Sequence, residues 1–262
     1  MDKTALQAAA DALWKASQER IALEQPLTEI YPDITIRDAY QVQLINVDKK
    51  KALGHKVVGK KIGLTSRAMQ QMLGVHEPDY GHVTDDMIGD EEVAISRSKL
   101  LQPKIEAEIA FVLKDRLVGP GVTLTKVLQA TAGVIPVFEI IDSRIKDWKI
   151  KIQDTIADNA SSAMVVLGSK LIPIDQVNLK YVGLVLEKNG EIIDTAAGAA
   201  VLGHPALAVA WLANKLSEFG IALEPGEIIL SGSFTKAYEV TGNDHFVASF
   251  GPLGSVKVKF TD

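Results

Sequence analysis

The chain has 262 residues, 47% hydrophobic and 23% charged, which is the composition of a globular protein long enough to bury a large core. Its formal net charge is −5, with both signs spread along the chain, and this argues against nucleic-acid binding. Because the chain contains no cysteine, it has no disulfide framework, thiolate zinc site or cysteine nucleophile, and any bound metal must use oxygen or imidazole ligands.

The first part of the chain is predicted to be helical. Residues 4–20 repeat apolar side chains at helical spacing, and Thr35 with Asp38 forms a capping-box pattern that announces a second helix ending at Gly54. Apolar stretches are interrupted well short of the ~20 residues that a bilayer crossing needs, and the N-terminus shows no signal-peptide core. We therefore expect a cytoplasmic protein with no membrane segment.

From Val57 onward, short β-branched runs separated by turn residues predict a β-rich body. Residues 184–194 read as a hairpin whose Asn189-Gly190 turn supplies two positive-φ residues. A helix is expected at 205–219, and strands are expected at 227–231, 245–249 and 254–260. The prediction is an α+β fold with a helical N-terminal segment, residues 1–55, and a mostly antiparallel β-rich domain, residues 56–262.

Acidic residues interrupt two apolar runs of this body. In "LLQPKIEAEIAFVLKD", strand alternation places Glu106 and Glu108 on one face. In "GVIPVFEIIDSR", Glu139 is flanked by apolar residues, with Asp142 three positions on. Three carboxylates from two neighbouring strands would suit Mg²⁺ or Mn²⁺. An exposed edge strand with solvent-facing glutamates fits the same alternation and remains the alternative.

Other polar residues are less informative. In "VVGKKIGLTS", either Lys60 or Lys61 must face inward, as a catalytic group or only as an ion-pair partner. "DTIADNASS" contains a cluster of polar residues between apolar segments, whose role is either to orient a small polar ligand or to cap a turn. The histidines show no ligand spacing that predicts a metal site, and we find neither a P-loop nor a dinucleotide-binding glycine motif nor a recognisable catalytic triad.

Several long motifs cover nearly the whole chain in order, and they include "KKIGLTS", "EPDYG", "PKIEAEIAFVL", "PVFEIIDSRIKDWKIKIQDTIADNASS", "AAGAAVLGHP" and "GEIILSGS". Together these motifs resemble the bacterial vinylpyruvate hydratases and 4-oxalocrotonate decarboxylases of the fumarylacetoacetate hydrolase superfamily. The resemblance implies a mixed β barrel or roll preceded by a helical segment. It also implies a metal site formed by Glu106, Glu108 and Glu139, with Mg²⁺ or Mn²⁺ as cofactor.

The same resemblance assigns further site residues. The Lys-hydrophobic-Gly-Leu-Thr stretch implies Lys61 as a catalytic residue, with Lys60 as its outward neighbour, and the Pro-Asp-Tyr-Gly segment implies Asp79 as an acid/base or substrate-orienting group. The residues implied to bind or lie near the substrate are Leu64, Asp158, Asn159 and Ser161. A metal-binding module without catalysis would use the same carboxylates, but would not explain an inward lysine beside them.

The resemblance favours one of two sister activities. "WKIKIQD" is similar to the hydratases, which add water to 2-hydroxypenta-2,4-dienoate to give 4-hydroxy-2-oxopentanoate in the meta-cleavage degradation of aromatic compounds. The alternative is 4-oxalocrotonate (2-oxohex-3-enedioate) decarboxylase, which releases CO₂ in the same pathway. Hydrolysis of a carbon–carbon bond is disfavoured, because we find no counterpart of the histidine that activates water in such enzymes. The resemblance also implies that the protein forms a homo-oligomer and that the hydratase and decarboxylase of one pathway form a complex.

Overall fold

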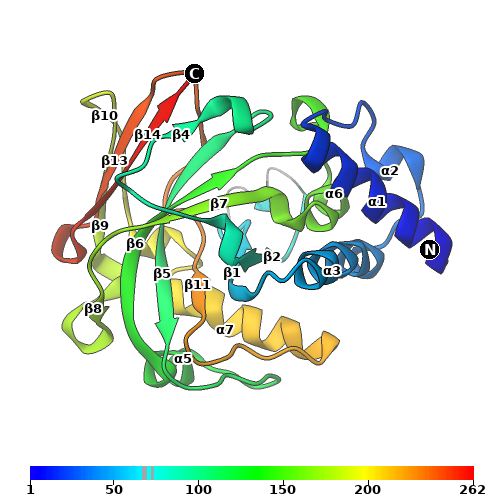
Figure 1. The fold of residues 1–262 in the computed structure, drawn as a ribbon. Helices are drawn as coiled ribbons and strands as arrows, with labels where there is room; N and C mark the ends of the chain where they lie inside the picture. Colours follow the sequence, from blue (N-terminus) through cyan, green and yellow to red (C-terminus); the bar gives the residue numbers. More distant parts are fainter. Residues whose placement is uncertain (67–69, 72–73) are drawn as a thin grey trace.

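The computed structural model describes residues 1–66, 70–71 and 74–262 (Figure 1). The N-terminal segment is helical, as predicted, with α1 (Lys3–Glu19), α2 (Leu27–Ile30) and α3 (Ile36–Ala52). The predicted capping box is present, since the Thr35 hydroxyl accepts from the Asp38 N–H and the Asp38 carboxylate accepts from the Thr35 N–H. Helices α1 and α3 pack against each other (Figure 1).

A large mixed sheet forms the centre of the molecule. Its strands run in the order β2-β1-β11-β5-β6-β7-β3, with β12 paired to β5 and β8 to β6. The long central strands β5 and β6 are antiparallel, whereas β1/β11 and β3/β7 are parallel pairs. The strands are β1 (Val57–Gly63), β2 (Asp79–Thr84), β3 (Ile88–Gly89), β5 (Lys104–Leu113), β6 (Thr131–Ile141), β7 (Ser162–Leu167), β8 (Ile172–Pro173), β11 (Ile228–Leu230) and β12 (Tyr238–Glu239).

A second sheet has the order β10-β9-β13-β14-β4. The predicted hairpin joins β9 (Gly183–Lys188) to β10 (Glu191–Ala197), and Asn189 and Gly190 at its turn have φ of 55° and 84°. The predicted C-terminal strands are also present. They are β13 (His245–Ser249) and β14 (Ser255–Thr261), which pair with each other, and β14 pairs in parallel with β4 (Ile95–Ser96).

The predicted long helix is α7 (Pro205–Leu216), extended by a 3₁₀ turn to Phe219. Pro205 occupies its first turn, His204 caps its N-terminus, and Gly220 follows with φ of 69°. In Figure 1, α7 lies at the lower side of the large sheet beside α5 (Leu124–Ala130).

One hydrophobic cluster extends from α1 and α3 through the sheets to α7. The fold is therefore α+β with N-terminal helices, whereas the division into residues 1–55 and 56–262 stays a prediction. Within the described residues, no helix combines the length and apolar character required to cross a membrane.

Candidate active site

Three glutamates meet on one face of the central strands. Glu106 of β5 lies directly opposite Glu139 of β6 in the antiparallel register, and Glu108 follows two positions along β5 on the same face. One carboxylate oxygen from each lies within 4.8 Å of the others. Because β5 runs between β11 and β6 rather than at an edge, and Glu108 and Glu139 are buried, the alternative of an edge strand with solvent-facing glutamates is wrong.

Burial makes this cluster electrostatically costly. Burial, with further contributions from Glu139 and Asp79, raises the pKa of Glu106 to about 7 against the lowering effect of Lys61. The pKa of Glu108 is raised well above its ordinary value, mainly by burial and also by the charges of Glu139 and Glu106. Burial also raises the pKa of Glu139. Glu108 accepts a hydrogen bond from the Gly232 N–H at 2.8 Å, but neither oxygen of Glu139 has a hydrogen-bond partner within the described chain. The cluster therefore contains carboxylate oxygens that accept no hydrogen bond, and such oxygens are the ligands that hard divalent cations prefer.

Lys61 of β1 faces this cluster. Its Nζ lies 3.3 Å from Glu139 Oε2 and donates to the Ala160 carbonyl at 3.1 Å. Burial lowers the pKa of Lys61, but the surrounding carboxylates more than offset burial, so the net pKa is raised. Lys61 is therefore held as a buried ammonium group beside the glutamates.

Lys60 points to the opposite face of the sheet, where it bonds Glu227. The expectation of an outward neighbour is wrong in one respect, because Lys60 is only 3% exposed. The residues that pair with Lys60 in the neighbouring strands, His82 of β2 and Ile229 of β11, are themselves buried on this face. Sequence alternation separates the two lysines correctly, but it does not reveal that both faces of β1 are covered.

Asp79 begins β2, directly opposite Gly63 of β1. It is buried, its Oδ1 has no hydrogen-bond partner within the described chain, and burial raises its pKa against the opposing effect of Lys61. A Cβ at position 63 would lie 2.2 Å from Asp79 Oδ1, so only glycine permits this approach. Asp79 and Lys61 thus reach the same cavity from neighbouring strands.

That cavity has a volume of about 560 Å³. Lys61, Asp79 and Glu106 line it together with Leu64 and Ser161, so five of the predicted site residues meet there. Glu108 and Glu139 lie in the buried wall beside Glu106. The apolar lining comprises Val75, Ile141, Trp148, Ile150 and Ile152, and three lysines, Lys104, Lys151 and Lys236, also line it.

Lys104 and Trp148 were not among the predicted site residues. Lys104 Nζ lies 4.6 Å from the centroid of the Trp148 ring, and Trp148 Nε1 donates to the Gln102 carbonyl at 3.1 Å. Trp148 and the preceding Asp147 have φ of 53° and 58°, which turns the indole toward the cavity wall. The signal for Lys104 was available, since it lies two positions before Glu106 and therefore on the same strand face.

Asp158 and Asn159 lie elsewhere. They follow α6 (Ile152–Ala157) and line a second cavity of about 290 Å³, which residues of α1 and α3 also line. Asn159, Ala160 and Ser161 have φ of 56°, 49° and 54°, a conformation that costs an L-residue roughly 1–2 kcal/mol each. This turn presents Ser161 to the larger cavity and Asp158 and Asn159 to the smaller one; their predicted contact with substrate stays a prediction.

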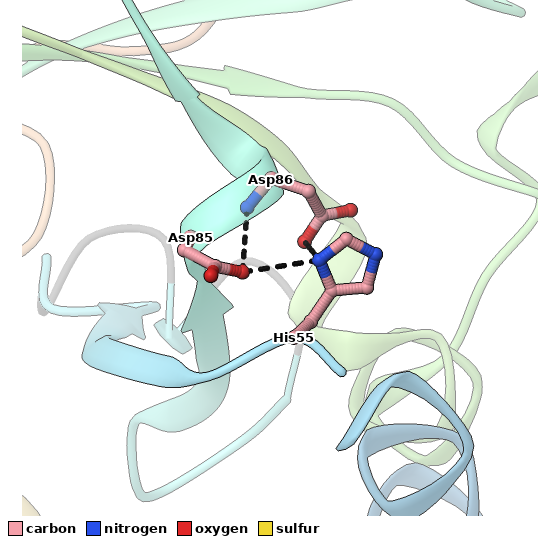
Figure 2. A group of neighbouring side chains, drawn as sticks. All are labelled: His55, Asp85 and Asp86. Atoms are coloured by element: carbon pink, nitrogen blue, oxygen red, sulfur yellow. Dashed lines mark hydrogen bonds and ion pairs between the residues drawn. The ribbon is translucent and has the colours of Figure 1, made fainter. Parts of the chain in front are cut away.

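A second group of potential metal ligands lies on the surface (Figure 2). His55 Nδ1 is 3.1 Å from Asp85 Oδ1 and 3.8 Å from Asp86 Oδ1, and Lys50 pairs with Asp86 at 2.8 Å. Asp85 Oδ1 also accepts from the N–H groups of Lys56 and Asp86. These carboxylates are already partnered, and we assign this group no ion.

Comparison with known proteins agrees with this geometry. The family model described as "Fumarylacetoacetate (FAA) hydrolase C-terminal" matches residues 58–261. The chain is 52% identical over 223 residues to a 2-hydroxypent-2,4-dienoate hydratase of Pseudomonas putida, covering 85% of this chain and 100% of that protein. It is 44% identical over 234 residues to a 4-oxalocrotonate decarboxylase of Pseudomonas sp. strain CF600, covering 89% of each.

Solved structures show the same architecture. The 4-oxalocrotonate decarboxylase from Pseudomonas putida G7, complexed with magnesium and adipate, superposes with a TM-score of 0.96 at 39% identity, covering 99% of this chain and 98% of that one. A fumarylpyruvate hydrolase from Pseudomonas aeruginosa, in complex with Mn²⁺ and pyruvate, shares the fold at a TM-score of 0.63 and 15% identity, covering 77% of this chain and 88% of that one. The expected fold type is confirmed, and the chain belongs to the fumarylacetoacetate hydrolase family.

Proposed function

We propose that the protein is a metal-dependent lyase that adds water to 2-hydroxypenta-2,4-dienoate, giving 4-hydroxy-2-oxopentanoate. The observation that carries the proposal is the convergence of a buried carboxylate cluster, an ammonium group and a buried carboxylic acid on one cavity. Relatives named as hydratases of this substrate class, at 44–52% identity, support it.

Glu106, Glu108 and Glu139 would hold the metal. The fit is supported by the buried oxygens of Glu139, which accept no hydrogen bond within the described chain, and by an all-oxygen donor set, which suits Mg²⁺ or Mn²⁺. Structures of relatives in complex with magnesium, calcium or Mn²⁺ support a divalent ion. When bound, such an ion supplies Lewis-acid polarisation of the substrate's carboxylate and the neighbouring C2 oxygen.

Side chains of the protein would then transfer the protons of the reaction and orient the substrate. Lys61, fixed by Glu139 and the Ala160 carbonyl, provides a permanent positive charge toward the oxygen end of the substrate. Asp79, with a free buried oxygen and a pKa raised by burial, is our candidate to deliver the proton that C5 requires when the dienol becomes a conjugated ketone. The enol hydroxyl gives up its proton as the C2 ketone forms, and water then adds with its hydroxyl at C4 and a proton at C3. Leu64 and Ser161 line the cavity and orient the chain of the substrate.

Decarboxylation of 4-oxalocrotonate, 2-oxohex-3-enedioate, is the second candidate. It is favoured by the three lysines of the cavity lining, because a second carboxylate requires a positive group at the far end of the substrate. Lys104 is spaced roughly 7 Å along the strand from Glu106, comparable with the separation of the two carboxylates in a six-carbon diacid. Relatives named as 4-oxalocrotonate decarboxylases, at 42–44% identity, support this candidate.

We further propose that the protein acts in the cytoplasm as a homo-oligomer and associates with the sister enzyme of the same pathway. The family resemblance supports this proposal. Analytical ultracentrifugation of the protein, alone and mixed with the sister enzyme, tests it; a monomer that does not associate contradicts it.

The decisive experiment supplies purified protein and Mg²⁺ with 2-hydroxypenta-2,4-dienoate and, separately, with 2-oxohex-3-enedioate, and identifies products by NMR. We expect 4-hydroxy-2-oxopentanoate from the first substrate. Release of CO₂ from the second with no hydration of the first would replace the hydratase by the decarboxylase. Turnover of neither substrate would refute both candidates. The Glu108→Gln variant is the matched inactive control, since it keeps the shape of the side chain while removing a ligand charge.

A further inference from the structure

The turn between α6 and β7 has a conformation that its sequence does not favour. Three consecutive non-glycine residues, Asn159, Ala160 and Ser161, have positive φ. Such residues adopt the left-handed region singly in most proteins, and a run of three persists only when surrounding contacts fix it. The contacts that hold this turn therefore determine where its carbonyl and hydroxyl groups point.

Asn159 ties the turn to β2. Its Nδ2 donates to the His82 carbonyl at 2.9 Å, and its Oδ1 accepts from the His82 N–H at 2.8 Å, so the side chain replaces a strand partner for that residue. The backbone also lies very close here, since a Cβ at Gly81 would be 2.4 Å from the Asn159 carbonyl oxygen. The Asn159 side chain thus fixes the turn to β2 at His82, while Gln43 Nε2 joins β2 to the end of α6 through the Tyr80 and Ile156 carbonyls.

Arg144 holds the turn from the other side. Its backbone N–H and its Nε donate to the two oxygens of Asp158, at 2.9 and 2.5 Å, and its guanidinium also bonds the Asp158 carbonyl. The same guanidinium donates to the carbonyls of Asp142 and Ser162, at 2.5 and 3.2 Å. Arg144 therefore connects the residue before the turn, the residue after it and the end of β6.

The turn so held touches the active site. The Ala160 carbonyl accepts from Lys61 Nζ at 3.1 Å, and Ser161 lines the larger cavity. We infer that Asn159 and Arg144 are positioning residues, which lock the left-handed turn so that the Ala160 carbonyl orients the Lys61 ammonium group toward the glutamates and the substrate. This inference deepens the proposed function and rests on it for its catalytic consequence. It also gives Asn159 a role that requires no contact with substrate.

The test compares Asn159→Ala with a matched variant, Asn189→Ala. Asn189 also has positive φ, at 55°, and its side chain also bridges another strand through the His245 N–H at 2.8 Å and Asp244 at 3.0 Å. It lies at the β9–β10 turn and lines neither cavity described above. Both substitutions remove two hydrogen bonds and leave alanine in the same backbone conformation. They differ in whether the turn contacts Lys61.

We expect Asn159→Ala to lower kcat on the order of 10²-fold while KM changes less than about threefold, and Asn189→Ala to lower Tm similarly with kcat within about twofold of wild type. Asn159→Asp, which keeps the acceptor for the His82 N–H, should recover part of kcat. Arg144→Lys, which cannot bond all of these acceptors, provides a second variant if Asn159→Ala fails to fold. We expect it to lower kcat about tenfold or more.

Crystal structures of the variants show whether Lys61 keeps its position, independently of any measurement of turnover. The Lys61 Nζ to Ala160 oxygen contact should be lost in Asn159→Ala or Arg144→Lys and kept in Asn189→Ala. If both site variants keep that contact, or keep wild-type kcat while Tm falls, the inference is overturned and the proposed function stands. If the wild-type protein turns over neither substrate, the proposed function fails, and the crystallographic contact still decides whether these residues position Lys61.

Discussion

Replacing Lys61 by methionine should cost stability in a strongly pH-dependent way. Its Nζ lies 3.3 Å from Glu139 Oε2, and at an effective dielectric constant of about 20 this separation corresponds to about 5 kcal/mol of attraction. Breaking a buried ion pair by removing one partner typically costs about 3–5 kcal/mol. We therefore expect the free energy of unfolding of the metal-free variant to fall by about 3–5 kcal/mol near pH 8.5, where the remaining carboxylates would be buried without a cation.

Near pH 5.5 the same substitution should cost less. Burial raises the pKa of Glu106, Glu108 and Glu139, and a carboxyl group with a raised folded-state pKa contributes stability at low pH that is lost as pH rises through that pKa. Without Lys61 these pKa values rise further, so the groups are protonated at pH 5.5. The remaining cost is mainly the lost hydrogen bond to the Ala160 carbonyl, about 1 kcal/mol.

Urea denaturation in EDTA at the two pH values measures both costs. Lys188→Met is the control, because the partly exposed Lys188 pairs with Asp244 at 2.9 Å, and hydrogen bonds to the Asp244 carboxylate outweigh burial and leave its pKa lowered. Asp244 stays ionised at both values, so the cost of Lys188→Met should be the same, within about 1 kcal/mol, at each pH. An equal cost of Lys61→Met at both pH values, or a larger one at pH 5.5, would refute the electrostatic account of the site.

Three further predictions concern ligands. Glu108→Gln should weaken Mg²⁺ binding at least about tenfold by calorimetry, whereas Glu239→Gln on β12 should leave it unchanged; equal affinities contradict the assigned ligand set. Because burial raises the pKa of Glu106 to about 7, Mg²⁺ must displace protons at lower pH, so its Kd should fall between about pH 5.5 and 8; a constant Kd contradicts this. Lys104→Met should weaken inhibition by adipate about tenfold and leave inhibition by a monocarboxylate unchanged; equal losses would place no carboxylate at Lys104.

The carboxylate cluster was the part of the site that sequence could locate. Period-two alternation is enough to place Glu106 and Glu108 on one strand face, and the apolar run around Glu139 indicates a buried strand. Alternation says nothing about register, however, and the cross-strand pairing of Glu106 with Glu139 depends on how β5 and β6 align over their whole length. The helices and the hairpin were predictable for a similar reason, because capping residues and Asn-Gly act over a few residues.

The orientation of residues 158–161 was beyond this kind of reasoning. Neither Ala160 nor Ser161 signals a left-handed conformation, which arises only because Arg144 and the His82 backbone hold the turn from either side. These contacts join segments far apart in the chain. The burial of Lys60 escaped prediction likewise, since it depends on the strands that pair with β1 and on what covers that face of the sheet.

The charge balance of the site connects its stability to its proposed metal. Glu106, Glu108, Glu139 and Asp79 face Lys61, so one ammonium group leaves most of their charge unbalanced if all are ionised. Without a metal the site balances by holding protons, as the raised pKa values of its acids indicate. A divalent cation would replace those protons and relieve the same repulsion. The stabilisation conferred by a fixed concentration of Mg²⁺ should therefore grow as pH rises, because the metal-free site becomes less stable while its affinity for the ion increases.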